Sequence, residues 1–71
     1  MVDVKIVKNA SEHWQALYAD DELIYESRII DEFDILRELK KKGYLSIDRF
    51  RSLIEHKIMP NNFKNLEVER I

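Results

Sequence analysis

The chain has no cysteine, and it contains only one glycine and one proline in 71 residues. Without cysteine it can form neither a disulfide bond nor a thiolate metal site, which fits a reducing compartment. The scarcity of glycine and proline argues against a disordered chain and against a glycine-rich phosphate-binding loop. No apolar run approaches the ~20 residues of a membrane-spanning helix, and the N-terminus lacks the apolar segment of a signal peptide. We therefore expect a soluble, cytoplasmic protein with no membrane contact.

A chain of this length forms a single domain, residues 1–71, and buries only ~60% of the surface that its unfolded form exposes. Its net charge of −2 hides an uneven distribution. Residues 1–36 contain three basic and nine acidic side chains, whereas residues 37–71 contain nine basic and five acidic ones, giving charges of −6 and +4. This layout favours oriented contacts with a charged partner or with a second copy of the chain.

Alternating hydrophobicity predicts strands in the first thirty residues. Residues 2–6 alternate between apolar and charged side chains, as in a strand with one buried face. Residues 13–19 and 22–29 are rich in aromatic and β-branched side chains, and two aspartates, Asp20 and Asp21, separate them. Because aspartate tolerates the backbone angles of a tight turn, these two segments predict a β-hairpin.

A two-residue turn in this hairpin places Tyr18 opposite Leu23 and Leu17 opposite Ile24. The more apolar face is expected to cover the core, and it carries Trp14, Ala16, Tyr18, Leu23, Tyr25 and Ser27. The second face is mainly polar, with Leu17 and Ile24 side by side at its centre. A slip of one residue would exchange the two faces, so this prediction depends on the register.

Two segments in the middle of the chain have helical patterns. Residues 31–43 begin with an N-cap aspartate and end with a C-cap glycine, and their apolar stripe consists of Phe33, Leu36 and Leu39, with Ile35 beside it. Residues 46–58 predict a second helix that begins at Ser46 and ends before Pro60. Its buried side consists of Ile47, Phe50, Leu53, Ile54 and Ile58.

These elements predict an α+β fold, in which a small antiparallel three-stranded sheet has two helices packed on one face. Residues 1–30 form the strand meander, residues 31–58 the helix pair, and residues 59–71 the tail. The alternation in residues 66–70 leaves two alternatives for this tail, a fourth strand or an extended segment.

The polar residues form no pattern typical of catalysis or metal binding. None of the four serines lies in a context that supplies a base and an orienting group. The two histidines, His13 and His56, are too far apart in the sequence to indicate a ligand set. Acidic residues cluster at the expected turn and at the first helix start, where acids have ordinary structural roles. We therefore expect no enzyme, no cofactor and no metal.

A basic segment supports nucleic-acid binding as the alternative function. Between residues 37 and 51, a helix, a glycine-containing turn and a second helix would resemble a helix–turn–helix, with the second helix presenting arginines. The basic residues are Arg37, Lys40, Lys41, Lys42, Arg49 and Arg51. The negative net charge and the acidic hairpin argue against this alternative.

The second hairpin face supports protein binding. An apolar pair with a polar border is typical of a small contact patch, and the patch comprises Gln15, Leu17, Glu22, Ile24 and Glu26. The open hairpin edge offers another route, in which a second copy adds a strand and forms a homodimer.

The segment from Trp14 to Tyr44 resembles small proteins of unknown function from bacteria and their phages. The shared pattern is Trp-x-x-Leu-Tyr, a tight turn and Leu-x-Tyr-Glu, carried here by Trp14, Leu17, Tyr18, Leu23, Tyr25 and Glu26. The resemblance implies a hairpin-plus-helix domain and a phage or prophage setting, with no active site to transfer. The favoured function is a non-catalytic module that binds a protein partner or itself through the hairpin, as a phage accessory or host-modulating protein.

Overall fold

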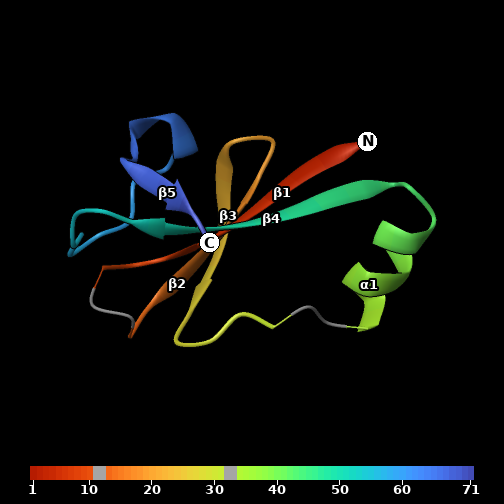
Figure 1. Cartoon of the computed structure of the whole chain (residues 1–71), viewed down its shortest axis with the longest axis horizontal. Helices are drawn as coiled ribbons and strands as arrows, with labels where there is room; N and C mark the ends of the chain where they lie inside the picture. The colour runs from red at the N-terminus through yellow and green to blue at the C-terminus, as the bar shows by residue number, and fades with distance from the viewer. Residues whose placement is uncertain (11–12, 32–33) are drawn as a thin grey trace.

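The computed structural model describes residues 1–10, 13–31 and 34–71. In this part of the chain, five strands form one mixed sheet, and a single α-helix lies at the end of the sheet where β1 and β4 begin (Figure 1). The helix α1 spans Asp34–Lys41, and a 3-10 helix, η1, spans Phe63–Asn65. The strands are β1 (Val2–Lys8), β2 (Gln15–Ala19), β3 (Glu22–Ser27), β4 (Leu45–Ser52) and β5 (Val68–Arg70).

The α+β character of the chain is as predicted, but the predicted architecture is wrong. The sheet has five strands in the order β3-β2-β1-β4-β5 instead of three, and one α-helix accompanies it instead of two. The sheet is also mixed, because β1 and β4 run parallel while the other neighbours are antiparallel. Parallel neighbours need a long connection, and here the β2–β3 hairpin and α1 form that connection. No helix in the described residues is long and apolar enough to cross a membrane.

The prediction of a second helix over residues 46–58 is wrong. The first half of this segment belongs to strand β4. Seven residues of β4 pair with β1, from Leu45 opposite Val2 to Arg51 opposite Lys8. This pairing overrides the helical spacing of the apolar side chains, since a short apolar segment fits either period and tertiary contacts decide. For the tail, the strand alternative is the one observed, as β5 pairs with the end of β4.

The hairpin is confirmed, with a register that differs from the prediction beyond its first two pairs. Asp20 and Asp21 have positive φ angles of 48° and 68°, as in a two-residue turn. Tyr18 pairs with Leu23 as predicted. Leu17 pairs with Tyr25 rather than with Ile24, because a bulge inserts one extra residue into β3 at this point.

Both faces of the sheet are covered, so the core has two parts. The face that α1 covers, called the helix face below, buries Val4, Ile6, Leu17, Ile30 and Leu45, against which Leu36, Leu39 and Ile47 pack. The opposite face, called the tail face, buries Val7, Ala16, Tyr18, Met59 and Leu66 beneath the chain that follows β4. The prediction that the Trp14 side of the hairpin lies beneath both helices is therefore wrong. Helix α1 covers the Leu17 side instead, and Trp14 remains 40% exposed.

Specific hydrogen bonds hold the chain after β4 onto the tail face. The buried side chain of Asn9 donates to the carbonyl of His56 (2.7 Å) and accepts from the amide of His56 (3.0 Å). The Tyr18 hydroxyl donates to the Pro60 carbonyl over 2.6 Å. Further along, the amide of Leu23 donates to the carbonyl of Asn61 (2.8 Å), so this chain also covers the first part of the outer edge of β3.

The C-terminal end of α1 agrees with the sequence prediction. Gly43 has a φ of 78°, and its amide donates to the Lys40 carbonyl at 3.1 Å, while the amide of Tyr44 donates to the Leu39 carbonyl at 2.9 Å. This geometry is a glycine C-cap that satisfies the last helical carbonyls. At the other end of α1, Glu32 and the predicted stripe residue Phe33 lie outside the described residues.

Candidate functional site

An open apolar groove of about 600 Å³ lies on the helix face, between the β2–β3 hairpin and α1. It exists because α1 has only eight residues and is therefore about 12 Å long, too short to cover a five-stranded sheet. The groove is lined by Val2, Val4, Leu17, Ala19, Ile24, Tyr25, Ile35, Leu36 and Leu45.

The rim of the groove exposes large apolar side chains. Ile35 of α1 is 73% exposed, and across the groove Ile24 and Tyr25 of β3 are 60% and 48% exposed. The floor is buried, since Val4 and Leu17 belong to the core of the helix face. Contiguous apolar surface of this kind marks interaction sites on small proteins more often than single exposed residues do.

The chemistry of the lining limits what the groove can hold. Among the described lining residues, the only side-chain polar atom is the Tyr25 hydroxyl, because the others all have hydrocarbon side chains. Small-molecule and catalytic sites place several convergent polar groups around an apolar pocket, and this groove lacks them. Its surface is complementary to apolar groups.

The structure separates the five residues that the sequence predicted for protein contact. Ile24 lies on the groove rim and Leu17 on its floor, so these two share one site although they do not face each other as predicted. Gln15 is buried, and its side-chain oxygen accepts from the amide of Ile30 over 3.0 Å. Glu22 and Glu26 are exposed. Leu17 and Gln15 are therefore buried, and only the other three are accessible.

The basic residues of the alternative function do not form a helix–turn–helix. Arg49 and Arg51 lie on strand β4, so no second helix presents them to a groove of nucleic acid. Arg51 binds the Glu69 carboxylate over 2.6 Å, and Arg37 binds that of Asp34 over 2.8 Å. The remaining basic residues stand at the C-terminal end of α1 and directly after it: Lys40, Lys41 and Lys42.

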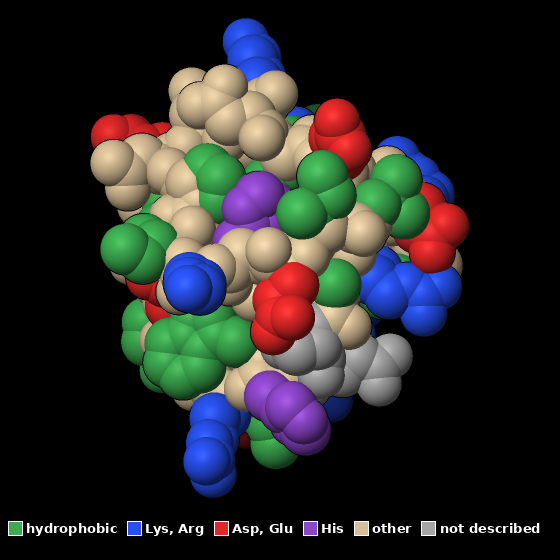
Figure 2. Space-filling model, turned by 90° about the vertical axis from the view of Figure 1, so that its left-hand side faces the viewer, with side chains coloured by type: hydrophobic (Ala, Val, Ile, Leu, Met, Phe, Trp, Pro, Cys, Tyr) green, Lys and Arg blue, Asp and Glu red, His purple; other side chains and the backbone are tan. Residues whose placement is uncertain are grey.

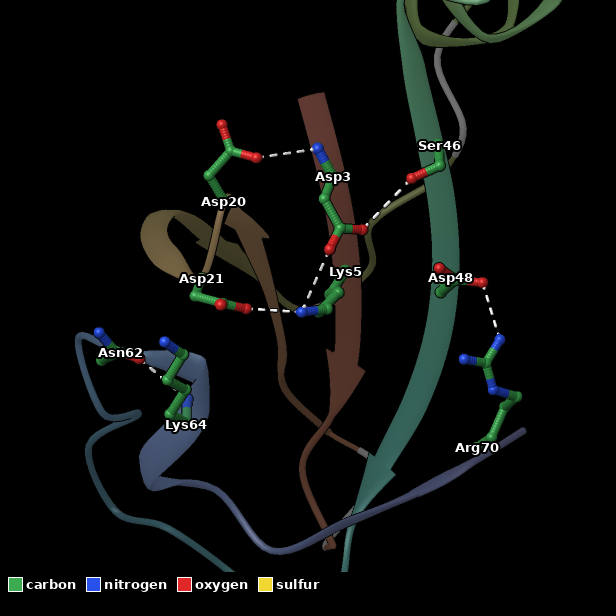
Figure 3. A network of polar contacts seen from close by, with 9 residues as sticks. All are labelled: Asp3, Lys5, Asp20, Asp21, Ser46, Asp48, Asn62, Lys64 and Arg70. Atoms are coloured by element: carbon green, nitrogen blue, oxygen red, sulfur yellow. Dashed lines mark hydrogen bonds and ion pairs between the residues drawn. The ribbon is translucent and has the colours of Figure 1, made fainter. Parts of the chain in front are cut away.

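The acidic residues near the hairpin turn form ion pairs and hydrogen bonds that connect parts of the fold (Figure 3). The ammonium nitrogen of Lys5 lies 2.5 Å from the Asp21 carboxylate and 3.3 Å from that of Asp3. The hydrogen bond that Lys5 donates to the Asp21 carboxylate raises the pKa of Lys5, against the opposing effect of burial. Nearby, the Asp48 carboxylate accepts from Arg70 over 2.8 Å. Among the described residues, no group of histidine and acidic side chains could hold a metal ion.

The two histidines lie apart on one end of the molecule, separated by other side chains (Figure 2). His13 is exposed, whereas the ring nitrogen Nε2 of His56 is buried without a hydrogen-bond partner. On the same view, hydrophobic side chains form small patches interrupted by charged groups. In this view, the described side chains form no continuous apolar surface comparable to the groove.

Comparison with protein-family models, with curated proteins and with solved structures found no match. The groove is therefore the feature of this chain that bears most directly on function.

Proposed function

We propose that the protein is a non-catalytic interaction module whose groove takes up apolar side chains of a partner protein. The observation that carries this proposal is the open apolar groove between the hairpin and α1. Its exposed lining residues, Val2, Ile24, Tyr25 and Ile35, would be covered in the complex. A few side chains that fill well-packed pockets, aromatic ones such as tyrosine above all, dominate the binding energy of protein interfaces.

The border of the groove is acidic, which indicates the charge that a protein partner would carry. Glu22 pairs with Ala19, which lines the groove, so the carboxylate of Glu22 stands on the same face at the rim. The adjoining turn residue Asp20 is exposed. An apolar centre with a charged rim is the usual anatomy of a protein interface. We therefore propose that the partner presents an apolar segment with a basic residue beside it, which would meet this acidic border.

The phage or prophage setting belongs to this proposal and depends only on the resemblance of the segment that begins at Trp14. In that setting the partner would be a host protein, and the module would act as an accessory or host-modulating factor.

Affinity capture from the native cells tests the groove directly. The immobilised chain is compared with Ile24→Lys and Ile35→Lys, which introduce a charge at the rim. The matched control is Ile58→Lys, because Ile58 is 84% exposed and lies outside the groove. We expect one partner that the unchanged chain and the control retain and that both rim variants lose, and the purified partner should then reproduce this pattern. Equal retention by all four proteins would contradict the proposal.

A further inference from the structure

A second hollow, called the Trp14 pocket below, lies beside the groove at strand β3. It has a volume of about 520 Å³ and is lined by Trp14, Leu23, Ile24, Tyr25 and Glu26. Ile24 and Tyr25 also line the groove, so the two hollows meet at these residues of β3. The Trp14 pocket differs from the groove in its chemistry, because it contains a carboxylate.

The bulge in β3 brings an apolar and an acidic side chain of this pocket onto the tail face. Leu23 pairs with Tyr18, which belongs to the tail-face core. Glu26 pairs with Ala16 of the same core. Because residues opposite each other on neighbouring strands point to the same face, Leu23 and Glu26 both do so here. In a regular strand, two residues three positions apart would point to opposite faces, and the extra residue of the bulge removes that difference.

A hydrogen bond holds the carboxylate of the pocket beside its aromatic ring. The indole nitrogen Nε1 of Trp14 donates to an oxygen of Glu26 over 2.9 Å. Within the described residues, the Glu26 carboxylate has no other hydrogen-bond donor and no basic partner. A carboxylate offers about four acceptor positions, so most of its capacity is left for a ligand. Trp14 is 40% exposed, and part of its side chain is therefore also accessible.

We propose that the Trp14 pocket binds an arginine side chain of a partner protein. The guanidinium group stacks on the indole of Trp14 and donates to the free oxygen of Glu26, and the methylene groups of the arginine lie against Leu23. Arginine suits this pocket better than lysine, because its planar head group stacks on aromatic rings and matches the geometry of a carboxylate. The charge of Glu26, which no described residue pairs, is complementary to that of the ligand.

This pocket is a contact separate from the groove and its acidic border. Because Ile24 and Tyr25 belong to both hollows, one partner segment can place an apolar side chain in the groove and an arginine in the pocket. The identity of the ligand as part of a protein rests on the proposed function. The affinity of the pocket for a guanidinium group does not, so the two can be tested separately.

The indole N–H signal in a ¹H–¹⁵N NMR spectrum tests the pocket directly, because Trp14 is the only tryptophan in the chain. N-acetylargininamide is titrated into the full chain at constant ionic strength. We expect a saturable shift with a dissociation constant on the order of 10 mM, since an exposed cation–π contact and an exposed ion pair are each weak. N-acetylcitrullinamide has a similar shape without the charge and should bind at least fivefold more weakly, and N-acetyllysinamide should also bind more weakly.

A matched pair of variants separates the role of Glu26 from the general acidity of the hairpin. Glu26→Gln removes the charge but keeps an oxygen that can accept from Trp14, and it should weaken arginine binding at least fivefold. The control is Glu22→Gln, an exposed acid of the same strand that does not line the pocket, and its affinity should be unchanged. Ile35→Gln, which alters only the groove, should also leave the affinity unchanged, so a failure of the pocket is distinguished from a failure of the groove.

Three results would overturn the proposal. The first is a Trp14 signal that does not move at ~100 mM of the arginine derivative, well above the expected dissociation constant. The second is equal affinity for the arginine derivative and for the citrulline or lysine derivative. The third is equal affinity of Glu26→Gln and Glu22→Gln for the arginine derivative, which would show that no specific contact with Glu26 is made.

Discussion

The Lys5 ammonium nitrogen lies 2.5 Å from the Asp21 carboxylate and so ties the central strand β1 to the hairpin turn. The same nitrogen lies 4.4 Å from the centre of the Phe63 ring, which belongs to η1. One cation therefore joins the centre of the sheet, the hairpin and the tail. This contact holds the hairpin in the position that forms one wall of the groove.

Replacing Lys5 by methionine should destabilise the fold by about 1 kcal/mol near neutral pH, since the ion pair is partly shielded from water. The pKa of Lys5 is raised in the folded state by Asp21 and Asp3. Its contribution is therefore fully present below the ordinary value of 10.5 and is lost as the pH rises through the higher folded value. Urea unfolding from pH 7 to pH 11 should show the two proteins converging at the alkaline end. A constant difference across that range would contradict this account, and Lys41→Met serves as the exposed control.

Tyr18 should make its own contribution to alkaline unfolding. Burial, together with the charge of Glu26, raises the pKa of Tyr18 to about 12 from 10.0. Because the unfolded chain loses this proton first, stability falls between these two pH values. Tyr18→Phe should lose about 1 kcal/mol at neutral pH, since the hydrogen bond to Pro60 is removed. Its stability should then decline less steeply than that of the unchanged protein above pH 10, and a steeper decline would show that the phenol is not responsible.

Glycine should be required at position 43 because of the backbone conformation there, and not because a side chain would clash with its neighbours. A Cβ atom at this position would meet nothing within 4 Å, but the φ angle of 78° is costly for residues with a side chain. Gly43→Ala is therefore expected to destabilise the protein by about 1 kcal/mol. Gly43→Asn should lose less, because asparagine tolerates this conformation best after glycine. Thermal unfolding followed by circular dichroism measures both, and equal losses would indicate a steric cause.

The two hairpin residues of the groove should respond differently to a charge. Leu17 is 6% exposed and Ile24 is 60% exposed. Leu17→Lys would bury an unpaired ammonium group and is expected to unfold the chain, whereas Ile24→Lys should keep a native circular dichroism spectrum and a similar melting temperature. If both variants stay folded, the sheet does not have the register described above.

Local signals in the sequence predicted the parts of the fold that local chemistry decides. Tolerance of positive φ at Asp20 and Asp21 indicated the turn, and the glycine at position 43 indicated the end of α1. Alternation likewise predicted β1, although Ile6 and Val7 are both buried because the strand is covered on two faces.

The errors came from contacts between distant segments. Residues 45–52 fit a helix or a strand by spacing alone, and only their pairing with β1 decides between the two. The bulge at Ile24 shifted the hairpin register without any glycine to indicate it. The sequence predicted that Leu17 and Ile24 lie side by side, and both line the groove. It missed Ile35, because nothing local places the first turns of α1 against the hairpin.

The most direct test of the groove as the docking site is the affinity of the captured, purified partner for three versions of this chain, measured by calorimetry. We predict that the unchanged protein and Ile58→Lys bind with the same dissociation constant, while Ile24→Lys, equally stable, binds at least tenfold more weakly. Equal affinities for Ile24→Lys and the unchanged protein, or a loss confined to Ile58→Lys, would show that the partner docks elsewhere.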